Sequence, residues 1–299
     1  MINKVALVTG SSQGIGFAIA KEFMKRAIKT VYVTAMTKQL GSDAIRKLKI
    51  EGFKPEFHLL DVTDSTSVKN CADCVLQRHG RLDILVNNAG VTAKDLEKTT
   101  YEDSVRVLNT NYYGNLTVEK HFFPILNENA RVINISSICG HISNLRNKYW
   151  IGKLTNNNLE RADIDAFVNW FLDSVKNGTV RAEDFFQTEM LAYRISKIAL
   201  CALTIVQQRE IGRNISINSI HPGFVKTAIN RGMGFYSVEQ GAKAPVYLAL
   251  DVDQSVKGQY FWPNKKTVLE AMDWSNPDLP FYFDYELFRK INLNMRSSS

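Results

Sequence analysis

Residues 5–16, VALVTGSSQGIG, decide the fold of this chain. A short apolar run rich in β-branched residues ends in a glycine-rich turn, and a helical pattern follows with Ile15, Ile19 and Phe23 on one face. This order predicts a buried parallel strand, a tight turn and the N-terminus of a helix. Backbone N–H groups and the positive helix end then point at one place, where glycines let a pyrophosphate approach. The Gly-x3-Gly-x-Gly spacing is a variant of the dinucleotide fingerprint, although a plain strand-turn-helix unit also matches it.

The rest of the chain repeats this alternation of short apolar runs and helical patterns. Further strands are expected at Thr30–Ala35, Pro55–Leu60, Leu82–Val86, Arg131–Ile135, Ile215–Ile220 and, as the last one, Gly258–Trp262. Further helices are expected at Ser42–Glu51, Ser65–His79, Tyr101–Leu126, Ala192–Gln208 and Val238–Leu250. The alternation predicts an α/β fold, a Rossmann-like doubly wound parallel sheet with helices on both faces. The ligand site of such a sheet lies beyond the carboxyl ends of its strands.

One segment interrupts the alternation. Residues 138–191 are polar and contain helical fragments such as Ile164–Val175, so we interpret them as an insert in the same domain. We therefore expect a single domain over residues 1–274 and a C-terminal extension over residues 275–299, in which aromatic residues cluster. The sequence does not decide whether this extension packs on the sheet edge, covers the binding site or is partly disordered.

Bulk properties exclude several classes of protein. The formal net charge of +7 is scattered along the chain, so a nucleic-acid-binding face is not indicated. No apolar run approaches membrane-spanning length, and the first strand begins so near Met1 that no signal peptide is expected. The cysteines, Cys71, Cys74, Cys139 and Cys201, do not form a metal-ligand pattern. We expect reduced thiols, no metal site and a cytoplasmic location.

Tyr193 and Lys197 are one helical turn apart, so both side chains leave the same face of the expected helix. An ammonium beside a phenol stabilises the phenolate and lowers its pKa, which suits general acid–base chemistry. A Tyr and a Lys at this spacing are also common on protein surfaces, so the pair alone does not identify a site.

Further motifs occur in a fixed order along the chain. They are Asn-Asn-Ala-Gly at 87–90, Asn-Tyr-Tyr-Gly at 111–114, Ser-Ser at 136–137, Tyr-x3-Lys at 193–197 and Pro-Gly-Phe-Val-Lys-Thr at 222–227. Together with the first turn they closely resemble the short-chain dehydrogenase/reductase family, over residues 4–262. The insert, the helix at 237–250 and the Gly-Gln-Tyr-Phe ending at 258–261 are most similar to the monomeric carbonyl reductases and their plant relatives that reduce terpenoid and alkaloid ketones.

The resemblance implies a catalytic tetrad of Asn111, Ser137, Tyr193 and Lys197. In this family the serine holds the substrate carbonyl oxygen by a hydrogen bond, and the tyrosine donates a proton to that oxygen. The lysine lowers the pKa of the tyrosine and grips the nicotinamide ribose. The asparagine holds a water that links the lysine to solvent.

The resemblance also implies a bound nicotinamide dinucleotide. The expected contacts are Gly10, Ser12, Gln13, Gly14, Ile15, Gly16, Lys38, Asp61, Val62, Asn88, Ala89, Gly90, Tyr193, Lys197, Pro222, Gly223, Val225 and Thr227. The second strand ends without an acid, so a ribose 2′-phosphate meets no repulsion there and finds Lys38. NADPH/NADP+ is therefore the expected cofactor. NADH stays an alternative, because the arginine usual in carbonyl reductases at the position of Met36 and the basic residue usual at the position of Gln13 are both absent.

The substrate site is expected to include Ser137, Cys139, Tyr193 and Phe235. It would lie between the insert, Thr92–Asp95 and the glycine-containing loop Ala228–Phe235, whose composition suits a mobile lid. In the carbonyl-reductase group the insert covers the helix face through which many relatives dimerise or tetramerise. We therefore expect a monomer that takes a small-molecule carbonyl substrate and binds neither nucleic acid nor a membrane.

These observations favour NADPH-dependent reduction of a ketone, aldehyde or quinone carbonyl by hydride transfer. One alternative is the reverse reaction, oxidation of a secondary or terpenoid alcohol with NAD(P)+. An alternative of another class is a non-catalytic dinucleotide-binding redox sensor. The physiological substrate and the stereochemistry of hydride delivery are not encoded in the motifs, because pocket loops vary independently of the scaffold.

Overall fold

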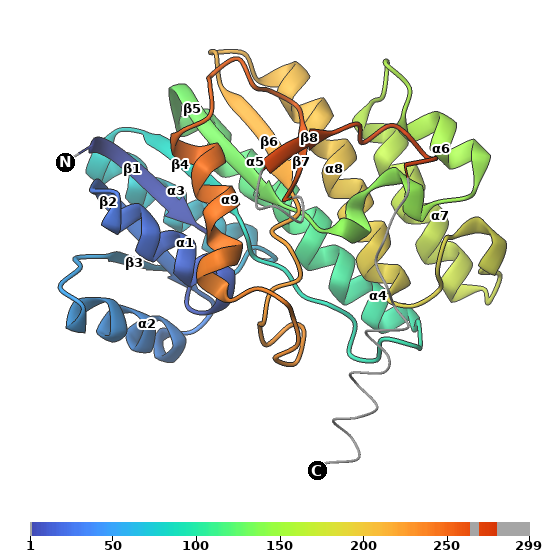
Figure 1. Cartoon of the computed structure of the whole chain (residues 1–299), viewed down its shortest axis with the longest axis horizontal. Helices are drawn as coiled ribbons and strands as arrows, with labels where there is room; N and C mark the ends of the chain where they lie inside the picture. The colour runs from blue at the N-terminus through green and yellow to red at the C-terminus, as the bar shows by residue number, and fades with distance from the viewer. Residues whose placement is uncertain (1, 264–268, 280–299) are drawn as a thin grey trace, which may run out of the picture.

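The computed structural model describes residues 2–263 and 269–279, in which strands and helices alternate as expected (Figure 1). The strands are β1 (Ile2–Val8), β2 (Ile28–Ala35), β3 (Glu56–Leu59), β4 (Leu82–Asn87), β5 (Leu126–Ile135), β6 (Ser216–Ile220), β7 (Tyr260–Pro263) and β8 (Leu269–Met272). The helices are α1 (Gly14–Lys25), α2 (Lys38–Ile50), α3 (Ser65–His79), α4 (Tyr101–Leu108), α5 (Gly114–Phe122), α6 (Lys148–Leu154), α7 (Arg161–Lys176), α8 (Leu191–Ile211) and α9 (Val238–Leu250). A π-helical turn at Asn109–Tyr113 joins α4 to α5.

The strands form one sheet in the order β3-β2-β1-β4-β5-β6-β7-β8. Neighbours from β3 to β7 are parallel, and the strand order reverses between β1 and β4, which is the expected doubly wound arrangement. The prediction that the strand near residue 260 is the last was wrong, because β8 pairs antiparallel with β7. A four-residue edge strand, Leu-Glu-Ala-Met, carries too little alternation to be recognised from the sequence.

Helices cover both faces of the sheet (Figure 1). Apolar side chains of α1, α2 and α9 pack with one face, and those of α3 and α5 pack with the other. The longest helix, α8, lies beside α4 on the second face, and its buried residues form a third cluster with both α4 and the insert. This burial fixes α8, and with it Tyr193 and Lys197, against the carboxyl ends of β5 and β6.

The insert is a helical layer on α4 and α8 rather than a separate body. Phe167 and Phe171 of α7 are fully buried in the cluster that contains α4 and α8. Arg161, at the start of α7, pairs with Glu119 of α5 and Glu210 of α8. The insert therefore covers the outer face of the helix that carries Tyr-x3-Lys.

The described part of the C-terminal segment turns back over this region. Trp274 is buried, and its indole N–H donates to the carbonyl oxygen of Gly140 at 2.7 Å. The aromatic cluster expected in the extension lies at 281–288, outside the described residues. Across residues 2–263 and 269–279, no helix is both long enough and apolar enough to cross a bilayer.

Candidate active site

The glycine-rich turn between β1 and α1 lies where the carboxyl ends of β1 and β4 meet. Gly10 and Gly14 both have φ of +61°, a conformation that side chains other than glycine rarely adopt. A Cβ on Gly16 would lie 2.4 Å from Nδ2 of Asn88 and 2.8 Å from the carbonyl oxygen of Gly10. A side chain at any of these three positions would therefore be sterically unfavourable. The turn packs tightly against Asn88, just after β4.

This turn suits a pyrophosphate. Gln13, the N-cap residue of α1, makes no side-chain cap, and the first turn of α1 carries no acidic residue. The N–H groups and the positive end of the helix macrodipole are thus left for an anion. Thr227, beyond β6, lies near the same turn, with its Cγ2 3.7 Å from the position of a Cβ on Gly14. These residues fit a dinucleotide held between the turn and the loop after β6.

Two predicted cofactor contacts already have intramolecular partners. Nδ2 of Asn88 donates to the carbonyl oxygens of Thr9 and Gly10, each at 3.0 Å, so this side chain anchors the turn. Oδ1 of Asp61 accepts from the backbone N–H and the hydroxyl of Thr63, at 2.9 and 2.7 Å. A cofactor role for either side chain stays a prediction.

The end of β2, where a ribose 2′-phosphate is expected, is open. Met36, Thr37 and Lys38 are all exposed, and Lys38 is the first residue of α2. The hydroxyl of Thr37 accepts from the N–H of Leu40 at 3.3 Å and so caps this helix. A single lysine and a helix N-terminus therefore supply the positive potential at this edge.

Tyr193 and Lys197 lie on the same face of α8, as their spacing predicts. Nζ of Lys197 is 5.6 Å from the centroid of the Tyr193 ring and donates to the carbonyl oxygen of Ile135 at 2.7 Å. Ser137, two residues after β5, is near enough to Tyr193 for its side chain to lower the pKa of the phenol. The structure thus brings three of the four predicted catalytic residues, Ser137, Tyr193 and Lys197, into one corner between the end of β5 and the start of α8.

Burial sets the proton affinities in this corner. It raises the pKa of Tyr193 above its ordinary value, and the side chain of Ser137 offsets part of that rise. Burial lowers the pKa of Lys197 to about 8. The net shift of the Tyr193 pKa is therefore upward, opposite to the expected one, because desolvation of the phenol is its largest cause. Tyr193 remains a protonated phenol at neutral pH.

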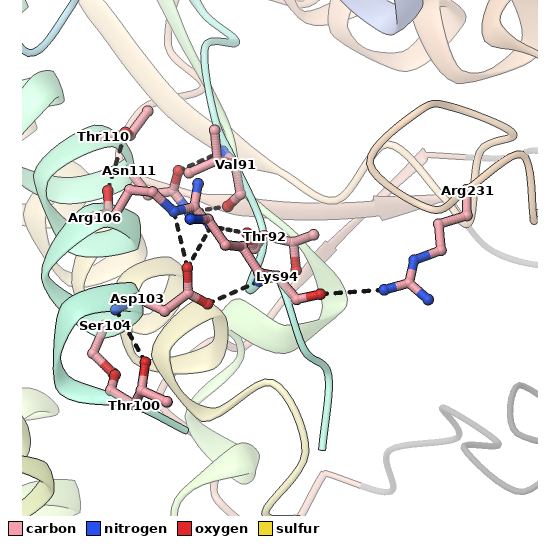
Figure 2. Close-up of polar contacts among 10 residues, drawn as sticks. All are labelled: Val91, Thr92, Lys94, Thr100, Asp103, Ser104, Arg106, Thr110, Asn111 and Arg231. Carbon is pink, nitrogen blue, oxygen red and sulfur yellow. Dashed lines mark hydrogen bonds and ion pairs between the residues drawn. The ribbon is translucent and has the colours of Figure 1, made fainter. Parts of the chain in front are cut away.

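Asn111 is the fourth member, and it is fully buried in the π-helical turn. Its Oδ1 accepts from the N–H of Val91, and its Nδ2 donates to the carbonyl oxygen of Val91, both at 2.9 Å (Figure 2). Its Nδ2 also donates to Oγ of Ser196 at 2.9 Å. Asn111 thereby ties the loop after β4 to α8, one residue from Lys197. The π-helical turn that places it had no sequence signal, although such turns are frequent at functional sites.

Sequence reasoning also missed the residues that hold Ser137 and Lys197 in place. A Cβ on Gly140 would lie 2.4 Å from Oγ of Ser136 and 2.8 Å from the carbonyl oxygen of Lys197, so only glycine fits there. The hydroxyl of Tyr260 donates to the carbonyl oxygen of Ser137 at 3.0 Å. The short Ser-Ser-x2-Gly spacing was the only available signal for the first of these contacts.

The loop that follows Val91 is fastened to α4 and to the loop after β6 (Figure 2). Arg106 donates to the carbonyl oxygen of Thr92 and to Asp103, and Asp103 accepts from the N–H of Lys94 at 2.8 Å. The guanidinium of Arg231 donates to the carbonyl oxygen of Lys94 at 3.2 Å. The two loops expected to border the substrate therefore meet at one exposed hydrogen bond.

The remaining predicted substrate residues differ in exposure. Cys139 is 2% exposed, and its N–H donates to Oγ of Ser137 at 3.2 Å. Phe235 is 65% exposed, and its ring lies edge-on to Phe224 at 5.6 Å between centroids. A substrate role for both residues stays a prediction.

His221, at the end of β6, is buried and has an unsatisfied ring nitrogen. Its Nδ1 has no hydrogen-bond partner among the described residues, and its ring lies edge-on to Trp262 at 5.7 Å. Burial lowers the pKa of His221 to about 3, so the imidazole is neutral. An unsatisfied buried nitrogen of this kind costs about 1–3 kcal/mol.

Comparisons with known proteins agree with this geometry. The family model described as short chain dehydrogenase matches residues 4–150. Carbonyl reductase [NADPH] 1 of Bos taurus is 33% identical over 256 residues, which are 83% of this chain and 91% of that protein. (+)-Neomenthol dehydrogenase of Arabidopsis thaliana is 33% identical over 289 residues, which are 88% and 97% of the two chains. The structure of salutaridine reductase from Papaver somniferum superposes with a TM-score of 0.81 at 31% identity, over 86% of this chain and 99% of that chain.

Proposed function

This chain belongs to the short-chain dehydrogenase/reductase family, and we propose that it is an NADPH-dependent carbonyl reductase whose proton donor is Tyr193. The observation that carries the proposal is the corner in which Ser137, a protonated Tyr193 and Lys197 come together, with the Lys197 ammonium 5.6 Å from the centroid of the tyrosine ring and the Ser137 side chain close enough to lower the pKa of the phenol. A phenol that stays protonated at neutral pH suits the reductive direction, because reduction of a carbonyl consumes a proton at its oxygen.

Each side chain has a defined task in this proposal. Ser137 and Tyr193 present two hydroxyls that hold the carbonyl oxygen of the substrate, and Tyr193 releases its proton to that oxygen as negative charge develops there. Lys197, charged below pH 8, stabilises the phenolate that remains. Asn111 positions the loop after β4 against α8 beside Lys197. The bound nicotinamide supplies the hydride.

The preference for NADPH rests on the end of β2. A ribose 2′-phosphate there would meet Lys38, the N-terminus of α2 and no acidic side chain in the first helical turn. The carbonyl reductases to which this chain is similar are named for NADPH, which supports the same choice. We include a monomeric state in the proposal, because α7 and Arg161 cover the outer face of α8. A sedimentation mass near twice 33.9 kDa at micromolar concentration would contradict it.

The decisive experiment follows NADPH oxidation with menadione, an isatin, a terpenoid ketone and a long aliphatic aldehyde. Tyr193→Phe is expected to lower kcat by about 10²–10⁴-fold, the usual contribution of a positioned proton donor, with unchanged NADPH affinity by fluorescence. Tyr112→Phe is the matched control, because it also removes a tyrosine hydroxyl. The hydroxyl of Tyr112 donates a hydrogen bond to Asp165 at 2.8 Å. This variant should keep wild-type turnover.

Other outcomes would favour the alternatives. Tight NADPH binding without carbonyl reduction, but with turnover of secondary or terpenoid alcohols and NADP+, would favour the oxidative direction. Binding with no turnover in either direction would favour a dinucleotide sensor. Turnover by Tyr193→Phe within a few-fold of the wild type would overturn the assignment of the proton donor.

A further inference from the structure

The three-residue turn Ile138–Gly140 follows Ser137 directly and bonds to both of its oxygen atoms. Oγ of Ser137 accepts from the N–H of Cys139 at 3.2 Å. The carbonyl oxygen of Ser137 accepts from the N–H of Gly140 at 2.8 Å. A 3₁₀ turn as short as this one has weak internal hydrogen bonds, so its shape depends on contacts from elsewhere in the fold.

Two buried side chains from the last strands bond to the two ends of this turn. The hydroxyl of Tyr260, in β7, donates to the carbonyl oxygen of Ser137 at 3.0 Å. The indole N–H of Trp274, two residues after β8, donates to the carbonyl oxygen of Gly140 at 2.7 Å. Both side chains are buried, so little water competes for either bond. They come from one antiparallel strand pair, because Tyr260 is in register with Met272, the last residue of β8.

A third contact joins the same two segments. Nε2 of His141, the residue after the turn, donates to the carbonyl oxygen of Asp273 at 2.9 Å. The ring of His141 lies tilted against that of Tyr260, with 5.9 Å between the centroids. Residues 137–141 are therefore held at both ends by β7 and by residues 273–274.

The hydroxyl of Tyr260 has a task beyond filling space. Together with the N–H of Gly140 it gives the carbonyl oxygen of Ser137 two donors, one for each lone pair, and so fixes the plane of the peptide that follows Ser137. Burial raises the pKa of Tyr260 well above its ordinary value, so the hydroxyl keeps its proton and stays a donor at any pH used in an assay. A phenylalanine at this position would fill the same space but leave the carbonyl with one donor.

The proposed reaction makes the orientation of Ser137 important, because the hydroxyls of Ser137 and Tyr193 must meet at one carbonyl oxygen. Tyr193 is fixed within α8, whereas Ser137 lies after the end of β5, so their relative position depends on the loop that carries the serine. A misplacement of about 1 Å at a reacting group can cost about 100-fold in rate.

We infer that Tyr260 and Trp274 are positioning residues of the active site: they clamp the turn after Ser137 and thereby hold its Oγ where it meets the same carbonyl oxygen as the hydroxyl of Tyr193. The inference rests on the proposed carbonyl reductase activity and adds to it a role for β7 and β8. Both residues act through Ser137 rather than by touching the substrate.

The first test is Tyr260→Phe, which removes only the hydroxyl. We expect kcat with isatin or menadione to fall about tenfold, the effect of one hydrogen bond between neutral groups, while NADPH affinity by fluorescence stays unchanged. Tyr112→Phe is the matched control, because it also removes one hydroxyl from a fully buried tyrosine, and its kcat should stay at the wild-type value. Thermal unfolding checks that both variants are folded at the assay temperature.

A sharper comparison places Tyr260→Phe in a Ser137→Ala background. A residue that acts through Ser137 has no further effect once the serine hydroxyl is gone, so the tenfold loss should disappear there. Titration of isatin into NADP+-saturated protein gives the same comparison by affinity and does not depend on the residual turnover of Ser137→Ala.

Trp274→Phe tests the other end of the turn. It keeps an apolar ring but removes the donor to Gly140, three residues from Ser137, so we expect a smaller fall in kcat of about three- to fivefold. This effect should also disappear in the Ser137→Ala background. Trp150→Phe is the matched control, because Trp150 is also buried but packs in the insert against Phe167, and its kcat should not change.

Three results would overturn the inference. Turnover by Tyr260→Phe within twofold of the wild type would show that the hydroxyl has no kinetic role. A loss of the same size in the Ser137→Ala background would make Tyr260 a general structural residue. A parallel loss of NADPH affinity would assign the effect to the cofactor site.

Two further outcomes separate this inference from the proposed function. If the wild type turns over neither a carbonyl nor an alcohol, the proposed function fails and this inference fails with it. Wild-type turnover with an unaffected Tyr260→Phe overturns only this inference. If Tyr260→Phe does not fold, Trp274→Phe alone and in the Ser137→Ala background decides between the same outcomes.

Discussion

Two places at the carboxyl ends of the strands differ sharply in how the protein holds their polar groups. In the corner formed by β5, α8 and the π-helical turn, Asn111 is 0% exposed and Lys197 is 4% exposed, and both have defined hydrogen-bond partners. At the end of β2, Met36 is 66% exposed, and Lys38 extends from the first turn of α2 into solvent. The corner would carry the chemistry, and the β2 edge would select the cofactor.

The difference has a physical consequence for both stability and function. A buried polar group needs partners, so each member of the corner depends on several others, and a single change is costly. An exposed lysine keeps its hydration whether or not a phosphate is nearby, so its loss changes only the local potential. Substitutions should therefore have large, coupled effects in the corner and small, ligand-specific effects at the edge.

The largest expected effect is that of Asn111→Leu. This change keeps the volume of the side chain but leaves the N–H and the carbonyl oxygen of Val91 without their partner. We expect the free energy of unfolding to fall by about 2–4 kcal/mol and kcat to fall at least about 100-fold, measured by thermal unfolding and NADPH oxidation. Asn109→Leu, two residues earlier in the same turn and exposed, should change neither strongly. Equal effects of the two variants would show that the corner is not coupled as described.

A pH profile tests the electrostatics of the corner. The pKa of Lys197 is about 8, so its side chain is charged below that pH and neutral above it. The pKa of Tyr193 is raised, so the proton donor is retained through this range. We expect kcat/KM for NADPH to be level from about pH 6 to 7 and to fall towards tenfold per pH unit above about 8.

Lys197→Arg sharpens this prediction, because a guanidinium stays charged throughout the range. Its profile should lack the alkaline decline, even if its absolute rate is lower. A wild-type decline that begins only above about pH 10 would mean that Lys197 keeps an ordinary ammonium, and burial would then not govern the corner.

The same contrast explains what the sequence predicted well. The doubly wound sheet and the shared helix face of Tyr193 and Lys197 follow from local patterns, namely strand-helix alternation and an i, i+4 pair on one helix, whereas the resemblance to a known family placed Ser137 with them. Buried chemistry needs particular residue types at fixed spacings, so it leaves motifs in the chain. The bounds of α3 and α9 were predicted without error, because each has a polar N-cap residue, Asp64 and Ser237.

What the sequence did not predict depends on contacts between distant segments. The bond from Tyr260 to Ser137 joins residues 123 positions apart, and the Asn111–Ser196 bond joins residues 85 apart. The pKa of Tyr193 was expected to fall, because the sequence shows the nearby charge of Lys197 but not the burial of the phenol. Burial raises this pKa in the folded protein. The unsatisfied nitrogen of His221 is also visible only once β6 and β7 are paired, since its environment comes from both strands.

Lys38→Ala tests the β2 edge and should have a smaller effect. We expect KM for NADPH to rise about three- to tenfold, with KM for NADH and the melting temperature unchanged, because the lysine acts only on the 2′-phosphate. Lys49→Ala, at the other end of α2, is the matched control and should leave both Michaelis constants unchanged. A similar rise in KM for NADH would show that Lys38 acts on the shape of the helix rather than on the phosphate.

The smallest effect is expected for the hydrogen bond that joins the two loops at the mouth of the site. Arg231 has a positive φ of 52°, and its guanidinium reaches the carbonyl oxygen of Lys94 at 3.2 Å (Figure 2). Because this contact is exposed, Arg231→Ala should raise KM for the carbonyl substrate only about two- to threefold and leave kcat and NADPH affinity unchanged. Lys226→Ala removes another exposed cation from the same loop and should have no effect. The rise caused by Arg231→Ala should persist at high salt, since a hydrogen bond to a backbone carbonyl is screened less than an ion pair. If kcat also fell for Arg231→Ala, closure of these two loops would be coupled to the chemistry of the buried corner.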